Sequence, residues 1–192
     1  MRVIAGKFRS RPLQSLRGMD LRPTADRLRE TLFNVLSAGN PDAFVGTVWL
    51  DLFAGTGAVG IEALSRGAAR VLFVESSSSA AGLIERNLKS LGIAGGVEVL
   101  KRDASRALRV LEARETAFDF IFLDPPYRME NIYVQTLQAL SQSATLLKPN
   151  GVIIAEHDKR SDPGDSFAPL RRFRILKQGD AALSFYRIAQ SQ

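Results

Sequence analysis

The sequence predicts an α/β protein with a doubly wound, seven-stranded, mostly parallel sheet that ends in a C-terminal antiparallel hairpin. Two observations carry this prediction. From Val48 onward, short apolar runs alternate with segments of helical periodicity, which is typical of a parallel sheet with helices on both faces. In addition, a glycine-rich loop follows the first apolar run, in the strand–loop–helix context of a cofactor-binding turn.

The elements can be assigned in order along the chain. A first helix, with Thr24 as its N-cap, is predicted by apolar residues at helical spacing: Leu28, Leu32, Val35 and Leu36. The alternation then predicts strands at 48–53, 70–75, 97–100, 118–123 and 151–156, and helices at 58–66, 78–91, 104–113 and 131–146. Two strand-like runs at 172–176 and 183–189 are separated by a short turn, which indicates a terminal hairpin.

Residues 1–20 are rich in cations and predict a small basic β-hairpin extension, followed by one main domain over residues 21–192. The chain has a formal net charge of +6 and a pI of about 10.1, a balance that favours a polyanionic partner. The candidate RNA-binding residues are Arg2, Lys7, Arg9, Arg11 and Arg22. A second cationic cluster near the C-terminus consists of Arg171, Arg172, Arg174 and Lys177.

The composition excludes several classes of protein. The 192 residues suffice for one sizeable core, and no apolar run approaches the roughly 18 residues of a membrane span. No hydrophobic leader is evident at the N-terminus, so a cytoplasmic location is expected. Because the chain has no cysteine and a single histidine, disulfides and cysteine–zinc sites are excluded and no metal site is expected.

The glycine-rich loop runs from Asp51 to Gly60 and predicts a cofactor site. Glycines let the backbone turn tightly and approach a ligand closely, and Glu75, at the end of the next strand, lies where a ribose diol would bind. Asp51 to Ala54 separate the apolar run 48–50 from the first glycine, which favours S-adenosylmethionine over NAD and argues against an oxidoreductase. The candidate cofactor-binding residues are Asp51, Phe53, Ala54, Gly55, Thr56, Gly57, Glu75, Asp103 and Ala104.

Asp103 and Ala104 follow the third predicted strand, in a loop expected to open beside the cofactor base. The Asp103 carboxylate can accept a hydrogen bond from the adenine amine. It can equally cap the following helix, because Asp is favoured at the N-cap. The two roles are compatible.

Asp124-Pro125-Pro126-Tyr127 closes the buried strand 118–123 and supplies the candidate catalytic residues. Proline fixes φ and lacks a backbone donor, so the carbonyls of this turn are left free to accept hydrogen bonds. If an amine donates one hydrogen bond to such a carbonyl, Asp124 can accept a second hydrogen bond from it. The Tyr127 ring offers a stacking surface. These groups suit chemistry on the exocyclic amine of a nucleobase.

Taken with these motifs, the chain resembles the RsmD family of bacterial 16S rRNA guanine-N2 methyltransferases, within the class I, Rossmann-like S-adenosylmethionine-dependent fold. The resemblance runs nearly end to end, and its marks are Met1 to Lys7 with Arg9 and Arg11, Arg22 to Arg27, Asp51 to Gly60, Glu62 to Ala68, Phe73 to Glu75, and Asp124 to Tyr127. Gln178 and Ala181 depart from the family's usual Tyr-Gly-x-Thr near the C-terminus, which leaves the roles of these two side chains open.

The resemblance implies methyl transfer to N2 of a guanine in small-subunit rRNA, within the assembled or nearly assembled small subunit, by a monomer. Two alternatives remain open from the residues. Asp-Pro-Pro-Tyr is also similar to adenine-N6 methyltransferases acting on DNA or RNA. A non-catalytic RNA-binding protein that retains the fold is the other alternative.

Overall fold

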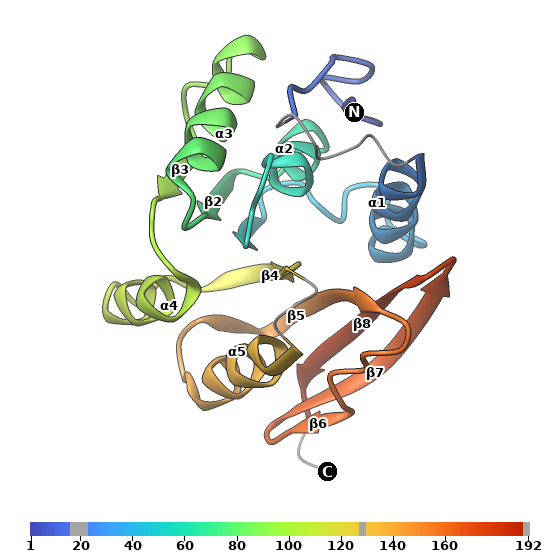
Figure 1. Cartoon of the computed structure of the whole chain (residues 1–192), viewed down its shortest axis with the longest axis vertical. Helices are drawn as coiled ribbons and strands as arrows, with labels where there is room; N and C mark the ends of the chain where they lie inside the picture. Colours follow the sequence, from blue (N-terminus) through green and yellow to red (C-terminus); the bar gives the residue numbers. More distant parts are fainter. Residues whose placement is uncertain (16–22, 127–129, 190–192) are drawn as a thin grey trace.

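The computed structural model describes residues 1–15, 23–126 and 130–189, and its centre is one mixed sheet (Figure 1). The described strands form an eight-stranded sheet in the order β3-β2-β1-β4-β5-β8-β7-β6. The strands are β1 (Val48–Leu52), β2 (Arg70–Val74), β3 (Val97–Leu100), β4 (Phe118–Leu123), β5 (Leu147–Asp158), β6 (Ser166–Phe167), β7 (Leu170–Gln178) and β8 (Ala181–Ile188). The helices are α1 (Pro23–Leu36), α2 (Ala58–Ser65), α3 (Ser78–Ser90), α4 (Ala104–Ala113) and α5 (Glu130–Gln142).

The pairing confirms the predicted parallel core with antiparallel strands at the C-terminal side. β1 pairs in parallel with both β2 and β4, and the parallel region continues through β3 on one side and β5 on the other. β8 pairs antiparallel with β5 and β7. The strand order reverses between β1 and β4, and ligands of open α/β sheets bind at the carboxyl ends of the strands beside such a reversal.

Three details differ from the sequence predictions. The sheet has an eighth strand, β6, whose two residues lie between prolines in a stretch without strand periodicity. β5 begins at Leu147 rather than Gly151, because an irregular register opposite Phe118 and Phe120 accommodates Pro149 in the strand. α1 begins at Pro23, so Thr24 lies inside the helix instead of capping it.

The two faces of the sheet carry separate cores (Figure 1). One core joins α1, α2, α3 and the first residues of the chain to one face, and the other joins α4 and α5 to the opposite face. Trp49 of β1 is fully buried and stacks on Phe33 of α1 and Phe120 of β4, with ring centroids 5.4 and 4.5 Å apart. This aromatic stack fixes α1 on the sheet through the amino-terminal halves of β1 and β4.

Residues 1–15 contain one isolated antiparallel bridge, between Arg2 and Pro12, rather than the two-stranded hairpin expected from the sequence. The segment is held mainly by α2, because its backbone amides donate to helix side chains. Ile4 and Ala5 donate to the Glu62 carboxylate at 2.8 and 2.9 Å. The segment is therefore part of the domain core, to which it contributes buried Val3 and Leu13.

Across residues 1–15, 23–126 and 130–189, no helix combines the length and apolar character needed to cross a membrane.

Candidate active site

Two adjoining cavities lie at the carboxyl ends of β1, β2 and β4, beside the reversal of strand order. The larger, of about 450 Å³, is lined by Phe53, Gly55, Val74, Glu75, Ser76, Arg102, Asp103, Ala104, Asp124, Pro125, Pro126 and Ile132. The smaller, of about 200 Å³, is lined by Met1, Arg29, Asp51, Phe53, Ala54, Gly55, Thr56, Ala58, Val59, Phe122, Asp124 and Glu156. Phe53, Gly55 and Asp124 line both cavities and therefore stand between them.

The glycine-rich loop has a strained backbone at the wall of both cavities. Phe53 has a φ of 72°, in the left-handed region that a non-glycine residue rarely adopts, and it is followed by Gly55 and Gly57 with φ of 53° and 76°. The amides of Phe53 and Ala54 both donate to the Val74 carbonyl, at 3.0 and 2.9 Å, which holds this conformation. Such strain gathers at functional sites, where the surrounding structure stabilises it.

Asp51 anchors the loop from inside. Its carboxylate is only 2% exposed and accepts a hydrogen bond from the Gly60 amide at 2.9 Å, so it joins the end of β1 to the start of α2. Burial, together with the charges of Asp124 and Glu75, raises the pKa of Asp51 to about 7, against the lowering effect of the Gly60 amide. In this environment a nearby cation would stabilise the ionised form of the carboxyl group.

We expect Asp51→Asn to stabilise the protein against unfolding at about pH 8 and to have a smaller effect at about pH 5. The folded-state pKa of Asp51 is raised to about 7, so stability is lost as pH rises from the unfolded pKa of 3.8 through that value. Removing the charge raises the free energy of unfolding by up to about 4 kcal/mol at the higher pH. The asparagine oxygen can still accept a hydrogen bond from the Gly60 amide. Urea unfolding of both proteins at the two pH values measures this. A difference in stability that does not change with pH would contradict the assignment.

Glu75 connects the loop to β2. One carboxylate oxygen accepts from the Gly55 amide at 2.9 Å and the other from the Ser77 amide at 2.8 Å. Each oxygen has a further lone pair, so these bonds leave acceptor capacity toward the larger cavity, which Glu75 lines. The residue thus both fixes the glycine-rich loop and presents a carboxylate beside it.

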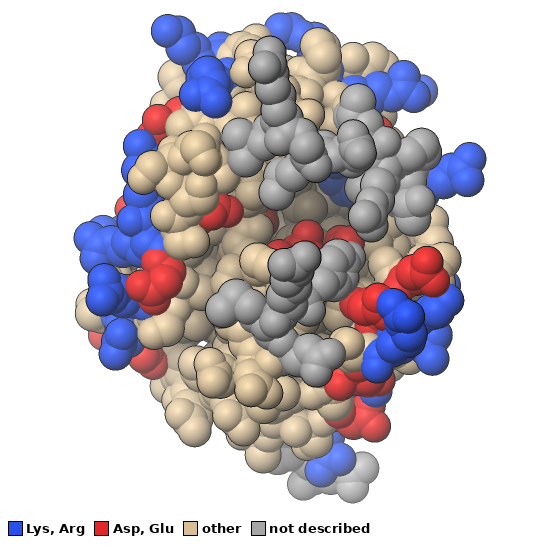
Figure 2. All heavy atoms as spheres, viewed as in Figure 1, with Lys and Arg blue, Asp and Glu red and all other residues tan. Residues whose placement is uncertain are grey.

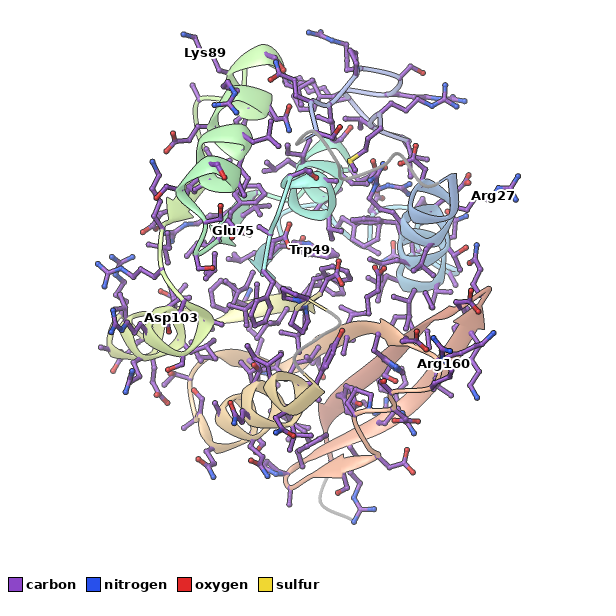
Figure 3. All side chains as sticks on the ribbon, in the orientation of Figure 1. Arg27, Trp49, Glu75, Lys89, Asp103 and Arg160 are labelled. Atoms are coloured by element: carbon purple, nitrogen blue, oxygen red, sulfur yellow. The ribbon has the colours of Figure 1, made fainter. Side chains whose placement is uncertain are left out.

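Asp103 caps α4, since its side chain accepts from the Arg106 amide at 2.9 Å, and it also lines the larger cavity with Ala104. The capping role expected from the sequence is confirmed. Figure 3 shows Glu75 near the end of β2 and Asp103 at the start of α4, on the same side of the molecule. The two carboxylates thus come from neighbouring strand ends, while Ala104 keeps the wall between them apolar.

Asp124, Pro125 and Pro126 follow β4 and line the larger cavity. Burial raises the pKa of Asp124 to about 7. The Tyr133 hydroxyl of α5 donates to the Glu156 carbonyl at 2.8 Å and lies 3.4 Å from the Pro125 carbonyl, so this second contact is weak. The Pro125 carbonyl therefore keeps acceptor capacity. Tyr127 lies outside the described residues.

The sequence reasoning missed three residues of the smaller cavity: Met1, Arg29 and Glu156. Glu156 lies in β5 next to Asp124, and burial and the Asp124 charge raise its pKa well above the usual range, against the opposing charge of Arg29. A strand-end carboxylate adjacent to β4 was the signal available for Glu156. Arg29 and Met1 carried no local signal, because only the tertiary fold brings them to the cavity.

Lys and Arg side chains lie mainly along the edges of the face in Figure 2, while Asp and Glu side chains gather nearer its middle. Arg2, Lys7, Arg9 and Arg11 are exposed on the N-terminal segment, and Arg22 lies outside the described residues. The C-terminal cluster is divided, because the mostly buried Arg172 forms ion pairs with Asp162 and Asp165.

Comparison with known proteins identifies the family. The family model described as Conserved hypothetical protein 95 matches residues 1–187. The chain is 34% identical over 195 residues to the ribosomal RNA small subunit methyltransferase D of Haemophilus influenzae, covering 100% of this chain and 94% of that protein.

The protein of the same name from Escherichia coli is 36% identical over 156 residues, covering 81% of this chain and 71% of that protein. A solved structure of a hypothetical protein from Thermus thermophilus aligns with a TM-score of 0.80 and 26% identity, over 98% of this chain and 99% of that chain. The chain therefore belongs to the RsmD family of methyltransferases, the family described as Conserved hypothetical protein 95.

Proposed function

We propose that this protein transfers the methyl group of S-adenosylmethionine to the exocyclic N2 amine of a guanine in small-subunit rRNA, within the assembled or nearly assembled subunit. One observation carries the proposal. Asp124 lines both of two adjoining cavities, the larger beside Glu75 and Asp103 and the smaller beside Arg29 and Glu156. A methyl donor in the first cavity and a base in the second would meet at its carboxylate.

The residues around the larger cavity fit S-adenosylmethionine. Glu75 would accept from the ribose hydroxyls, and Asp103 would accept from the adenine amine against the small wall of Ala104. Buried Asp51 and Asp124 would favour a cation in their neighbourhood, which suits a sulfonium centre. Bound there, S-adenosylmethionine supplies an electrophilic methyl group.

The protein's task is to position a weak nucleophile, because the lone pair of the guanine amine is delocalised into the ring. Hydrogen bonds from the amine to the Asp124 carboxylate and the Pro125 carbonyl would hold the nitrogen in line with the methyl group. Alignment of two reactants can contribute about 7–11 kcal/mol to lowering the barrier in the best cases. Tyr127 would stack on a base turned out of its RNA structure.

Proton release completes the reaction. After transfer the nitrogen carries an extra proton, and water can accept it once the amine leaves the site. The pKa of Asp124 is raised to about 7 by burial, so this carboxylate can also receive the proton at neutral pH. Neither route requires a metal ion.

The exposed cations of residues 1–15 would contact RNA phosphates and so position the substrate without reading its sequence. Lys7 and Arg9 are suitable for a test, because both side chains are exposed, whereas Arg11 donates to the Ser90 carbonyl at 2.9 Å. Deleting the segment is unsuitable, because Glu62 would lose its backbone partners.

We expect the double variant Lys7→Ala/Arg9→Ala to bind small-subunit RNA more weakly and to reduce the slope of log affinity against log salt by about two. The matched control is Arg109→Ala/Arg114→Ala, which removes the same charge from α4 and its C-cap residue, on the opposite face of the sheet. Binding titrations at several salt concentrations measure the affinity and the salt slope of each double variant. Equal slopes for the two double variants would remove the N-terminal segment from the RNA interface.

Label transfer tests the proposed acceptor. Methyl-labelled S-adenosylmethionine is incubated with the protein and one of three acceptors: small subunits lacking the modification, naked small-subunit rRNA, or duplex DNA. We expect label in the subunits at a higher rate than in naked rRNA, and none in DNA. Label in DNA alone would contradict the proposed substrate. S-adenosylmethionine binding without transfer to any of the three would favour a binding protein.

A further inference from the structure

Glu156 and Asp124 form a pair of carboxyl groups on one face of the sheet. The parallel register pairs Leu123 with Ala155, so the residues that follow them, Asp124 just after β4 and Glu156 within β5, lie side by side. Leu123 and Ala155 both face the core formed by α4 and α5, and the alternation of side chains turns their successors toward α1 and α2. Both carboxyl groups line the smaller cavity.

Arg29 places a cation at the wall of the same cavity. Its side chain is 5% exposed, and one terminal nitrogen donates to the Arg2 carbonyl at 2.6 Å and to the Asp26 carboxylate at 3.2 Å. Its Nε lies 3.9 Å from a Glu62 oxygen and has no hydrogen-bond partner among the described residues. The guanidinium is therefore held in place at the cavity wall, and its charge acts on Glu156.

The three side chains line one cavity and supply the acceptor and donor types that one nucleobase edge requires. The Watson–Crick edge of guanine carries, in order, the N2 amine, the N1–H donor and the O6 acceptor. If Asp124 and Pro125 hold the amine, the next group needed is an acceptor for N1–H, and the one after it is a donor for O6. Adenine instead presents a lone pair at N1, next to its amine, and so has no hydrogen there to donate to a Glu156 oxygen.

We propose that Glu156 is the residue that selects guanine, by accepting the N1–H of the target base on a carboxyl oxygen while the Arg29 guanidinium, on the wall of the same cavity, faces O6. The inference rests on the proposed function, because it assumes that Asp124 binds the reacting amine. It adds the reason for base choice, which Asp-Pro-Pro-Tyr alone does not supply. A site that hydrogen-bonds a substrate group rejects analogues that lack it, because its own buried polar group is left unpaired.

The test uses 2-aminopurine, which keeps the N2 amine but has a lone pair at N1 and no O6. Small subunits are reconstituted with guanine or with 2-aminopurine at the methylated position, and kcat/KM is measured for the wild type and for Glu156→Gln. We expect the wild type to prefer guanine by about ten- to a hundredfold or more. The glutamine amide can donate to the N1 lone pair, so the preference should shrink at least about tenfold in the variant.

Two further readouts separate this inference from its alternatives. Glu156→Gln should bind S-adenosylmethionine as the wild type does, and Glu98→Gln, a Glu-to-Gln change at a β3 residue paired with Arg70 and Arg114, should retain the full preference. An unchanged guanine preference in Glu156→Gln would overturn the inference and leave the proposed function standing. Failure of the wild type to methylate guanine at all would instead refute the proposed function.

Discussion

Replacing Asp124 with alanine is expected to reduce methyl transfer by about 10²- to 10³-fold or more, the scale seen when one preorganised hydrogen-bonding group is lost from a catalytic site. The carboxylate is shared by the two cavities, and no other described side chain lines both and carries a charge. Its loss would leave the amine with the Pro125 carbonyl alone, so the nitrogen would no longer be held in line with the methyl group.

Single-turnover transfer with saturating S-adenosylmethionine measures this effect, and calorimetric titration measures cofactor affinity separately. We expect the affinity of Asp124→Ala to change little, because Glu75 and Asp103 line the cofactor cavity independently of Asp124. Asp124→Asn is the matched variant: it keeps one acceptor oxygen and should lose less activity than alanine. Transfer by Asp124→Ala at the wild-type rate would rule out the proposed role.

Replacing Glu62 with alanine is expected to lower the free energy of unfolding by about 3–5 kcal/mol, the cost of removing one partner from a buried ionic group. The Glu62 carboxylate is fully buried and accepts from the Ile4 amide, the Ala5 amide and the Arg66 Nε at 2.8, 2.9 and 2.8 Å. Without it, two amides and two buried guanidinium groups, those of Arg66 and Arg29, lose a partner.

Urea unfolding measures the loss, and hydrogen exchange at the Ile4 and Ala5 amides locates it. We expect both amides to exchange faster in Glu62→Ala, because the N-terminal segment would be released from α2. The control is Glu98→Ala on β3, whose carboxylate also contacts two arginines but is partly exposed, so its loss should cost only about 0–1 kcal/mol. Similar stability losses in the two variants would show that Glu62 does not hold the segment.

The sheet could be predicted from the sequence because its central strands are buried on both faces. β1, β2 and β4 appear as mostly apolar runs, interrupted by Asp51 in β1 and Asp119 in β4, and the helices between them have helical periodicity. The cofactor loop was equally visible, because Gly55, Gly57 and Gly60 stand at fixed spacing after a strand. Gly60 also shows why the spacing is required: a side-chain carbon there would lie 2.4 Å from the Phe73 ring.

The other parts of the site depend on contacts between distant segments. Glu156 reaches the site only because β5 pairs with β4. Arg29 reaches it only because aromatic stacking fixes α1 against β1. The role of Glu62 was hidden because its partners are backbone amides, which every residue except proline has. The N-terminal segment was predicted as a hairpin from its composition, whereas its conformation follows from these bonds to α2.

The central claim is that one site delivers a methyl group to N2 of guanine, and the identity of the methylated nucleoside tests it most directly. Small subunits lacking the modification are labelled with methyl-labelled S-adenosylmethionine, their rRNA is digested to nucleosides, and the product is identified by chromatography and mass spectrometry. We expect all label in N2-methylguanosine with the wild-type protein and almost none with Asp124→Ala. Label in N6-methyladenosine would contradict the account of base choice, because Glu156 and Arg29 would then face the wrong edge.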